Sequence, residues 1–203
     1  MTGSGAVTIM NRSVPIGTHI CAFYSGPTGR DELVMPFLAE GIRAGHKCIC
    51  VLESLTPAEV LARLGRAVDL GRSVETGQLE LATPADAYLR AGPFSIDDML
   101  SYWEQAVAEA RGIEGTGLLR AAGEMPSALD DPDGRLAFFR YEARITTFVA
   151  DLPAVLLCLY DLQHFGAEVL VDSLRTHPMV VVDGGVHDNP YYIGPDAFLA
   201  GAE

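Results

Sequence analysis

The chain has 203 residues, 49% of them hydrophobic and 20% charged, which is typical of a compact domain with a sizeable core. Its 14 basic and 27 acidic residues give a formal net charge of -13, which repels nucleic-acid phosphates and anionic membranes at long range. We therefore expect no direct contact with nucleic acid or membrane, whereas the net charge does not exclude a small ligand or a protein partner.

The sequence carries no pattern typical of export or membrane insertion. No run reaches the ~20 apolar residues needed to cross a bilayer, and residues 1–11 are too polar for a signal peptide. We expect a cytoplasmic protein. The four cysteines are Cys21, Cys48, Cys50 and Cys158. They lie inside apolar runs and lack the C-x-x-C pairs or histidine spacing of zinc ligands, so we interpret them as buried structural thiols. No metal is predicted, and any cofactor stays unassigned.

One folded domain with two short flanking segments is the expected organisation. Residues 1–15 form a loose leader with Gly and Ser, which we expect to be flexible. Residues 16–190 form the domain. Residues 191–203 form a C-terminal tail with several apolar and aromatic residues, which we expect to pack as an irregular or swapped segment. Such a segment favours self-association, so a homo-oligomer formed through the tail or through sheet edges is predicted.

The first elements of the domain form a βαβ unit. Residues 19–24 are predicted to be a short buried strand, followed by a turn over 25–29. Apolar residues over 33–42 recur at helical spacing, and Gly45 is expected to end that helix. Residues 47–52 then form the second strand. A strand, a helix and a strand in this order are typical of a parallel pair.

The same alternation continues along the chain. Thr56, Pro57 and Glu59 are typical of a capped helix start. Further strands are predicted at 77–81, 118–122, 154–160 and 179–182, and further helices at 95–110, 136–149 and 167–174. Helices that alternate with apolar strands predict an α/β fold, a three-layer α-β-α sandwich with a mostly parallel central sheet. Ligands are expected at the carboxyl ends of its strands.

The turn after the first strand stands where a phosphate-binding loop, G-x-x-x-x-G-K-[ST], would lie. Tyr24 takes the place of the first glycine, Arg30 replaces the lysine, and Asp31 puts a negative charge where a hydroxyl holds magnesium. We interpret the segment as a degenerate Walker A loop and do not expect ATP hydrolysis. The loop is either a turn without a ligand or a site for an anion or other ligand at a helix N-terminus.

Short motifs with a shared order and spacing run along nearly the whole chain. They are HICAFY at 19–24, FLAEGI at 37–42, CICV at 48–51, GQL at 77–79, GEM at 123–125, YE at 141–142, CLYD at 158–161, HP at 177–178 and NPYY at 189–192. Together they resemble the MEDS family, the sensory domain named from methanogens, methylotrophs and the regulator DcmR.

This resemblance implies both a fold and a role. The family is similar to a branch of the RecA/KaiC-type ATPases, and it implies a sensor of small organic ligands, usually in front of a kinase or DNA-binding output. The chain has no room for such an output, so we expect a stand-alone sensor. Its signal would pass to a downstream protein such as a kinase or regulator.

Three carboxylates follow three of the predicted strands, namely Glu53, Glu124 and Asp161. Glu53 stands where the related ATPases keep a water-activating carboxylate. In a parallel sheet the three would face one crevice, where repulsion and burial raise the pKa of a carboxyl group. The alternative is that each caps a helix or pairs with an arginine such as Arg30.

Aromatic and histidine side chains are further candidates for ligand binding, but their pattern is less specific. Phe23, Tyr24, Tyr160 and Phe165 lie near strand ends and either line an apolar cavity or belong to the core. The histidines share no ligand spacing, so we interpret them as structural or hydrogen-bonding groups. They include His19 and His177 at strand starts, His164 and His187 in loops, and His46 as a solvated turn residue.

The sequence therefore predicts a ligand-binding sensory module without catalysis. The predicted ligand-binding residues are His19, Phe23, Tyr24, Arg30, Glu53, Glu124, Tyr160 and Asp161. The alternative is a nucleotide-binding switch or enzyme of the RecA/KaiC-like ATPase type that uses Glu53 and Glu124. A third hypothesis is a structural interaction protein.

Overall fold

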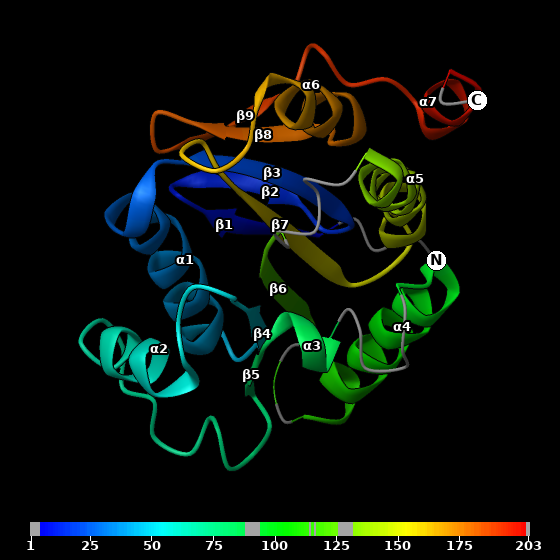
Figure 1. Cartoon of the computed structure of the whole chain (residues 1–203). Helices are drawn as coiled ribbons and strands as arrows, with labels where there is room; N and C mark the ends of the chain where they lie inside the picture. Colours follow the sequence, from blue (N-terminus) through cyan, green and yellow to red (C-terminus); the bar gives the residue numbers. More distant parts are fainter. Residues whose placement is uncertain (1–4, 88–93, 114, 116, 126–131, 202–203) are drawn as a thin grey trace.

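The computed structural model describes residues 5–87, 94–113, 115, 117–125 and 132–201, with a twisted sheet at its centre (Figure 1). Among these residues, the strands of this sheet lie in the order β5-β4-β6-β7-β3-β8-β9. They are β3 (Thr18–Tyr24), β4 (Lys47–Val51), β5 (Leu79–Ala82), β6 (Leu119–Glu124), β7 (Ala154–Asp161), β8 (Met179–Val182) and β9 (Gly185–Asp188). Neighbouring strands are parallel except β9, which is antiparallel to β8.

Strands β3 and β7 lie side by side at the centre and are buried along nearly their whole length. Continuous apolar runs of this kind are expected of parallel strands that helices cover on both faces. In their register, Cys21 lies beside Cys158 and Phe23 beside Tyr160. Because side chains alternate between the faces of a strand, these residues share one face, and Tyr24 points to the other.

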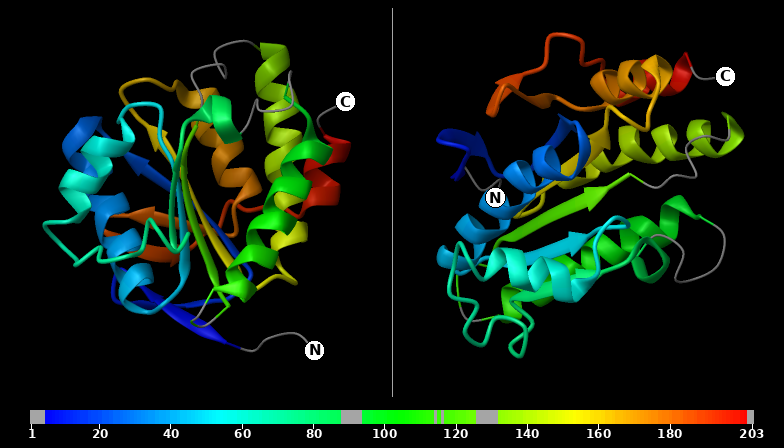
Figure 2. Two further views of the ribbon diagram at one scale, coloured as in Figure 1. Left: turned by 90° about the horizontal axis from the view of Figure 1, so that it is seen from below. Right: turned by 60° about the vertical axis from the view of Figure 1, so that its left-hand side comes forward.

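Helices cover both faces of the sheet (Figure 2). One face packs against α1 (Gly26–Arg43) and α2 (Pro57–Leu64), and the other against α4 (Ile96–Gly112) and α5 (Pro132–Val149). The short helix α3 (Pro84–Ala87) follows β5, whereas α6 (Ala167–Thr176) and α7 (Pro195–Ala200) pack against α5. The predicted α-β-α sandwich with a mostly parallel sheet is confirmed. No helix in the described ranges has the length and apolar character of a membrane span.

Local signals in the sequence account for the helix boundaries. At the start of α2, Thr56 and Glu59 form the predicted capping box, in which each side chain bonds the backbone of the other. After α1, Gly45 has a φ of 75°, the left-handed conformation that lets a glycine end a helix.

The segment expected to be a flexible leader contains a β-hairpin instead. Strands β1 (Ala6–Ile9) and β2 (Arg12–Pro15) pair across a turn in which Met10 and Asn11 have positive φ angles. A two-residue turn of this conformation matches the twist of the two strands. Ile9 and Val14 are fully buried in the core on the α1 side of the sheet. Burial of these two side chains is what orders the hairpin.

The C-terminal part also differs from expectation. The Asp183-Gly184 turn, with positive φ at both residues, folds β9 back on β8, which is the turn type that an Asp-Gly pair favours. The tail, expected to be irregular, forms α7, and its Phe198 is buried in the core beside α5. The tail therefore packs on its own domain, because Phe198 offers an apolar anchor.

Candidate functional site

The turn between β3 and α1 is too short for a phosphate-wrapping loop. Strand β3 ends at Tyr24 and α1 begins at Gly26, with Ser25 alone between them. The backbone N–H of Gly26 donates to the Asp161 carboxylate at 3.3 Å. An anion at this helix N-terminus would therefore meet a carboxylate that already takes the place of the phosphate.

Arg30, which stands in the place of the Walker A lysine, is turned into the protein and only 2% exposed. Its guanidinium donates to Ser54 Oγ at 2.5 Å and to Asp31 Oδ1 at 2.7 and 3.0 Å. Asp31 in turn forms an ion pair with Arg63 of α2. These charge-assisted bonds hold the cation between α1 and the β4–α2 turn.

Glu124 ends β6 inside a hydrogen-bond network and is only 4% exposed. Its carboxylate accepts from the Tyr24 hydroxyl at 3.0 Å, from the backbone N–H groups of Glu53 and Ser54 at 2.8 and 2.9 Å, and from Ser54 Oγ at 2.5 Å. Burial, with the nearby Glu124 charge, raises the pKa of Tyr24. The sequence predicts a carboxylate that faces a crevice with Glu53 and Asp161, whereas the structure places Glu124 as a buried link between β3, β6 and the β4–α2 turn.

The predicted site residues divide between the two faces of the sheet. Tyr24 and Glu124 lie on the α1 side, whereas Phe23 and Tyr160 lie on the α5 side with ring centroids 5.8 Å apart. The exposed Glu53 and the half-buried Asp161 remain at the carboxyl ends of β4 and β7, as expected. The period of two along each strand separates the two groups, so they do not form one pocket.

Four residues that are distant in sequence meet in a buried cluster on the α5 side. His19 comes from β3, Glu142 from α5, Cys158 from β7 and His177 from the segment between α6 and β8. Their possible ligand atoms all lie within 4.8 Å of one another. His19 Nε2 lies 3.1 Å from Cys158 Sγ and 3.4 Å from Glu142 Oε2, and His177 Nε2 lies 2.9 Å from the same carboxylate oxygen. We call these four residues the buried cluster.

Burial controls the protonation of the buried cluster. Desolvation, followed by the neighbouring His177, lowers the pKa of His19 well below its usual range. Desolvation, followed by the charge of Glu142, raises the pKa of the Cys158 thiol. Near neutral pH, His19 is therefore an uncharged imidazole and Cys158 a thiol.

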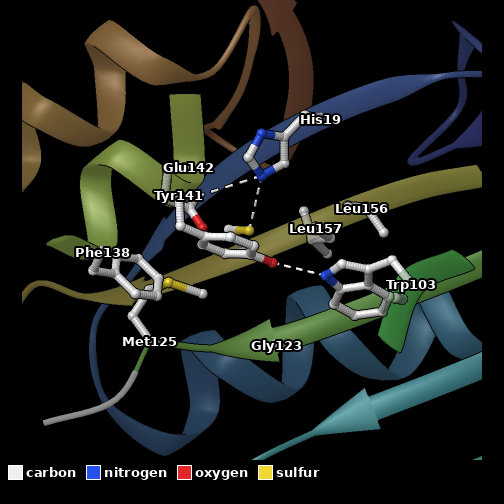
Figure 3. Close-up of a pocket in the computed structure, with 11 residues that line it drawn as sticks. His19, Trp103, Gly123, Met125, Phe138, Tyr141, Glu142, Leu156 and Leu157 are labelled. Carbon is white, nitrogen blue, oxygen red and sulfur yellow. Dashed lines mark hydrogen bonds and ion pairs between the residues drawn. The ribbon is translucent and has the colours of Figure 1, made fainter. Parts of the chain in front are cut away.

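A small cavity adjoins the buried cluster, between the sheet and helices α4 and α5 (Figure 3). It encloses about 20 Å³ of free space, which is room for about one water molecule. The indole N–H of Trp103 donates to the Tyr141 hydroxyl at 2.7 Å across this cavity, and Figure 3 shows His19 on its β3 side. The lining residues include Trp103, Met125, Phe138, Tyr141, His19 and Glu142.

Sequence reasoning placed His46 in the wrong setting and did not predict that His19 and His177 meet. His46, expected to be a solvated turn residue, is 5% exposed and accepts from Arg120 Nε at 2.9 Å. Burial, with the Arg120 charge, lowers the pKa of His46 to about 4. His19 and His177, which share no spacing in sequence, have ring centroids 3.9 Å apart.

The buried cluster was missed as a group, although each member lies in one of the short motifs described above. A signal was present for Glu142, because it shares the inner face of α5 with Phe138, Phe139 and Ile145. A carboxylate at a core position of an amphipathic helix requires a partner.

The sequence profile of the MEDS family, the methanogen/methylotroph, DcmR sensory domain, matches residues 18–178. The chain belongs to the MEDS family. The matched region of this MEDS chain contains the turn after β3, the Glu124 network and all four residues of the buried cluster.

One protein of similar sequence and one of similar structure extend this comparison. The transcriptional repressor DcmR of Methylorubrum extorquens (strain DSM 6343 / CIP 106787 / DM4) is 31% identical to it over 163 residues, which are 78% of the chain and 57% of the repressor. The chain thus spans little more than half the length of that relative. The KaiC-like protein PH0186 from the hyperthermophilic archaeon Pyrococcus horikoshii OT3 is similar in structure, with a TM-score of 0.55 at 14% identity over 82% of this chain and 70% of that one. This likeness shows the KaiC-like, RecA-type fold.

Proposed function

We propose that this MEDS chain senses a very small organic molecule, which binds without catalysis in the cavity between α4, α5 and the sheet. Membership of a sensory-domain family and similarity to a transcriptional repressor give the chain a sensory and regulatory role. The small cavity, lined mostly by apolar groups, is the observation that supports the ligand class.

The lining combines apolar walls with a few polar groups, as small-molecule sites do. Phe138 and Met125 supply apolar surface, and the Tyr141 hydroxyl and His19 supply polar atoms. About 20 Å³ of free space admits a ligand of few heavy atoms after small side-chain shifts, but not a nucleotide. The size of the cavity therefore favours a compound with one or a few carbon atoms.

The crevice at the carboxyl ends of the strands is the less favoured location. Two of its carboxylates already have hydrogen-bond donors from the protein, since Glu124 accepts four hydrogen bonds and Asp161 accepts from the N–H of Gly26. A ligand there would have to replace these bonds at a cost. Of the residues predicted from sequence, His19 lines the cavity, and its role there is part of the proposal.

Helices α4 and α5 form one wall of the cavity, so a ligand that enlarges it would shift them relative to the sheet. We propose that a downstream protein, such as a kinase or regulator, reads this shift. The energy available to move the helices is the difference in affinity of the ligand for the two arrangements.

Trp103 is the single tryptophan of the sequence and lines the cavity, so its fluorescence reports on occupancy. We expect a saturable fluorescence change with methanol, acetone or chloroform as probes, and none with bulkier members of the same classes. Ala121→Val, which fills the cavity, should abolish the change. Ala122→Val is the matched control, because Ala122 is equally buried but belongs to the core on the α1 side. The same response in both variants, or none in the unaltered chain, contradicts the proposal.

A further inference from the structure

The buried cluster contains a polar atom that the surrounding protein does not satisfy. Within the described part of the chain, His177 Nε2 is buried and makes no hydrogen bond, although it lies 2.9 Å from Glu142 Oε2. The other ring nitrogen, Nδ1, is 2.8 Å from the carbonyl oxygen of Ser173. A carbonyl can only accept, so Nδ1 carries the hydrogen. In the neutral ring, Nε2 then presents a lone pair to a carboxylate oxygen.

His19 is oriented in the same way. Its Nδ1 lies 2.8 Å from Thr146 Oγ1, and the single hydroxyl hydrogen of Thr146 is directed to the backbone carbonyls of Thr176 or Glu142, at 2.8 and 3.1 Å. Thr146 must therefore accept from Nδ1–H. The lone pair of His19 Nε2 then faces the thiol of Cys158 and the carboxylate of Glu142.

Two imidazole nitrogens, a carboxylate and a thiol thus converge within 4.8 Å of one another, an arrangement of electron-rich atoms that a bound cation stabilises. We propose that His19, Glu142, Cys158 and His177 bind a divalent transition-metal ion, with Zn²⁺ as the best match. Both imidazoles donate their other N–H to a carbonyl or hydroxyl, which is how metal-binding histidines are usually oriented. This inference concerns a site and a ligand that do not depend on the proposed organic molecule.

The geometry and the charge of the cluster both fit zinc. Bonds of about 2.0 Å in a tetrahedral site place nitrogen and oxygen ligands about 3.3 Å apart. The separations from Glu142 Oε2 to the two histidine nitrogens are 2.9 and 3.4 Å, and all the possible ligand atoms lie within 4.8 Å, so binding draws the wider pairs together. Two neutral imidazoles with one sulfur and one oxygen ligand suit a borderline-soft ion. On binding, the Cys158 thiol loses its proton to solvent and the sulfur bonds the metal, so thiolate and carboxylate together neutralise the two charges of the ion.

Such a site would connect four elements that lie far apart in sequence. The metal would join β3, β7, α5 and the segment between α6 and β8. Three of its ligands, His19, Glu142 and Cys158, also line the cavity. Metal occupancy would therefore fix one wall of the proposed binding pocket. With four protein ligands and little exposure, the site is of the closed, structural kind.

The test uses the full chain without a histidine tag, reduced, freed of metal with a chelator and dialysed against Zn²⁺ or Co²⁺. We expect one ion per chain by elemental analysis. With Co²⁺ we expect the visible spectrum of a tetrahedral complex together with thiolate-to-cobalt charge transfer. Cys158→Ser and His177→Asn should each weaken Zn²⁺ binding at least tenfold. Cys50→Ser is the matched control, a buried strand cysteine outside the cluster, and should bind as the unaltered chain does.

Circular dichroism of each variant establishes whether it folds. If a variant does not fold, the Co²⁺ spectrum of the unaltered chain still shows whether the cluster binds metal through a thiolate. Absence of stoichiometric metal overturns the proposal and assigns the cluster to a proton shared between the histidines and Glu142. Equal binding by Cys158→Ser overturns it as well. The Trp103 titration is run on metal-free and on Zn²⁺-loaded protein, so failure of the organic-ligand proposal is read separately from failure of the metal site.

Discussion

The Tyr24 hydroxyl donates to the Glu124 carboxylate at 3.0 Å and so joins the ends of β3 and β6, two strands that β7 separates in the sheet. With the backbone N–H groups of Glu53 and Ser54 on the same carboxylate, the bond also holds the β4–α2 turn. The edge of the sheet that binds nucleotide phosphates in P-loop proteins is here closed by the chain's own side chains.

Replacement of Glu124 tests this structural role. Glu124→Gln keeps the shape but removes the negative charge that several donors and Arg30 surround, so we expect the free energy of unfolding to fall by about 2 kcal/mol or more. Glu75→Gln is the control, because Glu75 is 73% exposed in its side chain, and should change stability by less than about 0.5 kcal/mol. Urea denaturation measures both. A negligible loss of stability with weakened ligand binding would instead support the ligand-recognition role predicted from sequence.

Restoration of the Walker A residues should not create an ATPase. In Arg30→Lys with Asp31→Thr, β3 still passes into α1 through one residue, and Asp161 still occupies the N–H of Gly26. We expect no magnesium-dependent phosphate release from ATP, and reduced stability because Asp31 no longer pairs with Arg63. Sustained turnover above that of the unaltered chain would show that a phosphate site survives.

His46 should make stability depend on pH in the mildly acidic range. Its pKa is about 4 when folded, against 6.5 ordinarily, so the unfolded chain takes up a proton first. The stabilisation by uncharged His46 is therefore complete above pH 6.5 and is lost as the pH falls toward 4. We expect the free energy of unfolding to fall by roughly 2 kcal/mol over this range, after allowance for partial solvation of the ring. The charged neighbours are Arg120 from β6 and, through it, Glu40 from α1.

Unfolding free energies measured across this pH range test the point. His46→Gln should flatten the curve between pH 6.5 and 4, whereas His187→Gln, at an exposed position of β9, should leave its shape unchanged. An identical slope in the His46 variant would mean that other groups produce the acid sensitivity.

The tail should matter more for stability than for association. Phe198→Ala removes a ring buried beside α5 and should cost about 3 kcal/mol. Tyr191→Ala alters a residue that is 67% exposed and should cost less than about 0.5 kcal/mol. Chemical denaturation compares the two. Sedimentation of the same proteins tests the homo-oligomer predicted from sequence, and a change of association state in Tyr191→Ala alone would favour the tail as its interface.

Much of the fold follows from local patterns in the sequence. The capping box at Thr56 and the apolar run of β7 depend on neighbours a few residues apart, so a single segment contains all the information. The hairpin over residues 6–15 lacked such a signal, because it is ordered by the burial of Ile9 and Val14 in a core formed by later segments. Membership of the MEDS family was likewise readable from the order of short motifs.

The assembly of the sites was decided by the tertiary structure. The sequence placed Glu53, Glu124 and Asp161 at strand ends, but strand alternation and crossover connections determined that Glu124 would be enclosed by Tyr24 and Ser54. The buried cluster brings together residues up to 158 positions apart, since His177 less His19 is 158. No local pattern encodes such a meeting, because it results from the side-by-side packing of β3, β7 and α5 after the chain has crossed the sheet several times.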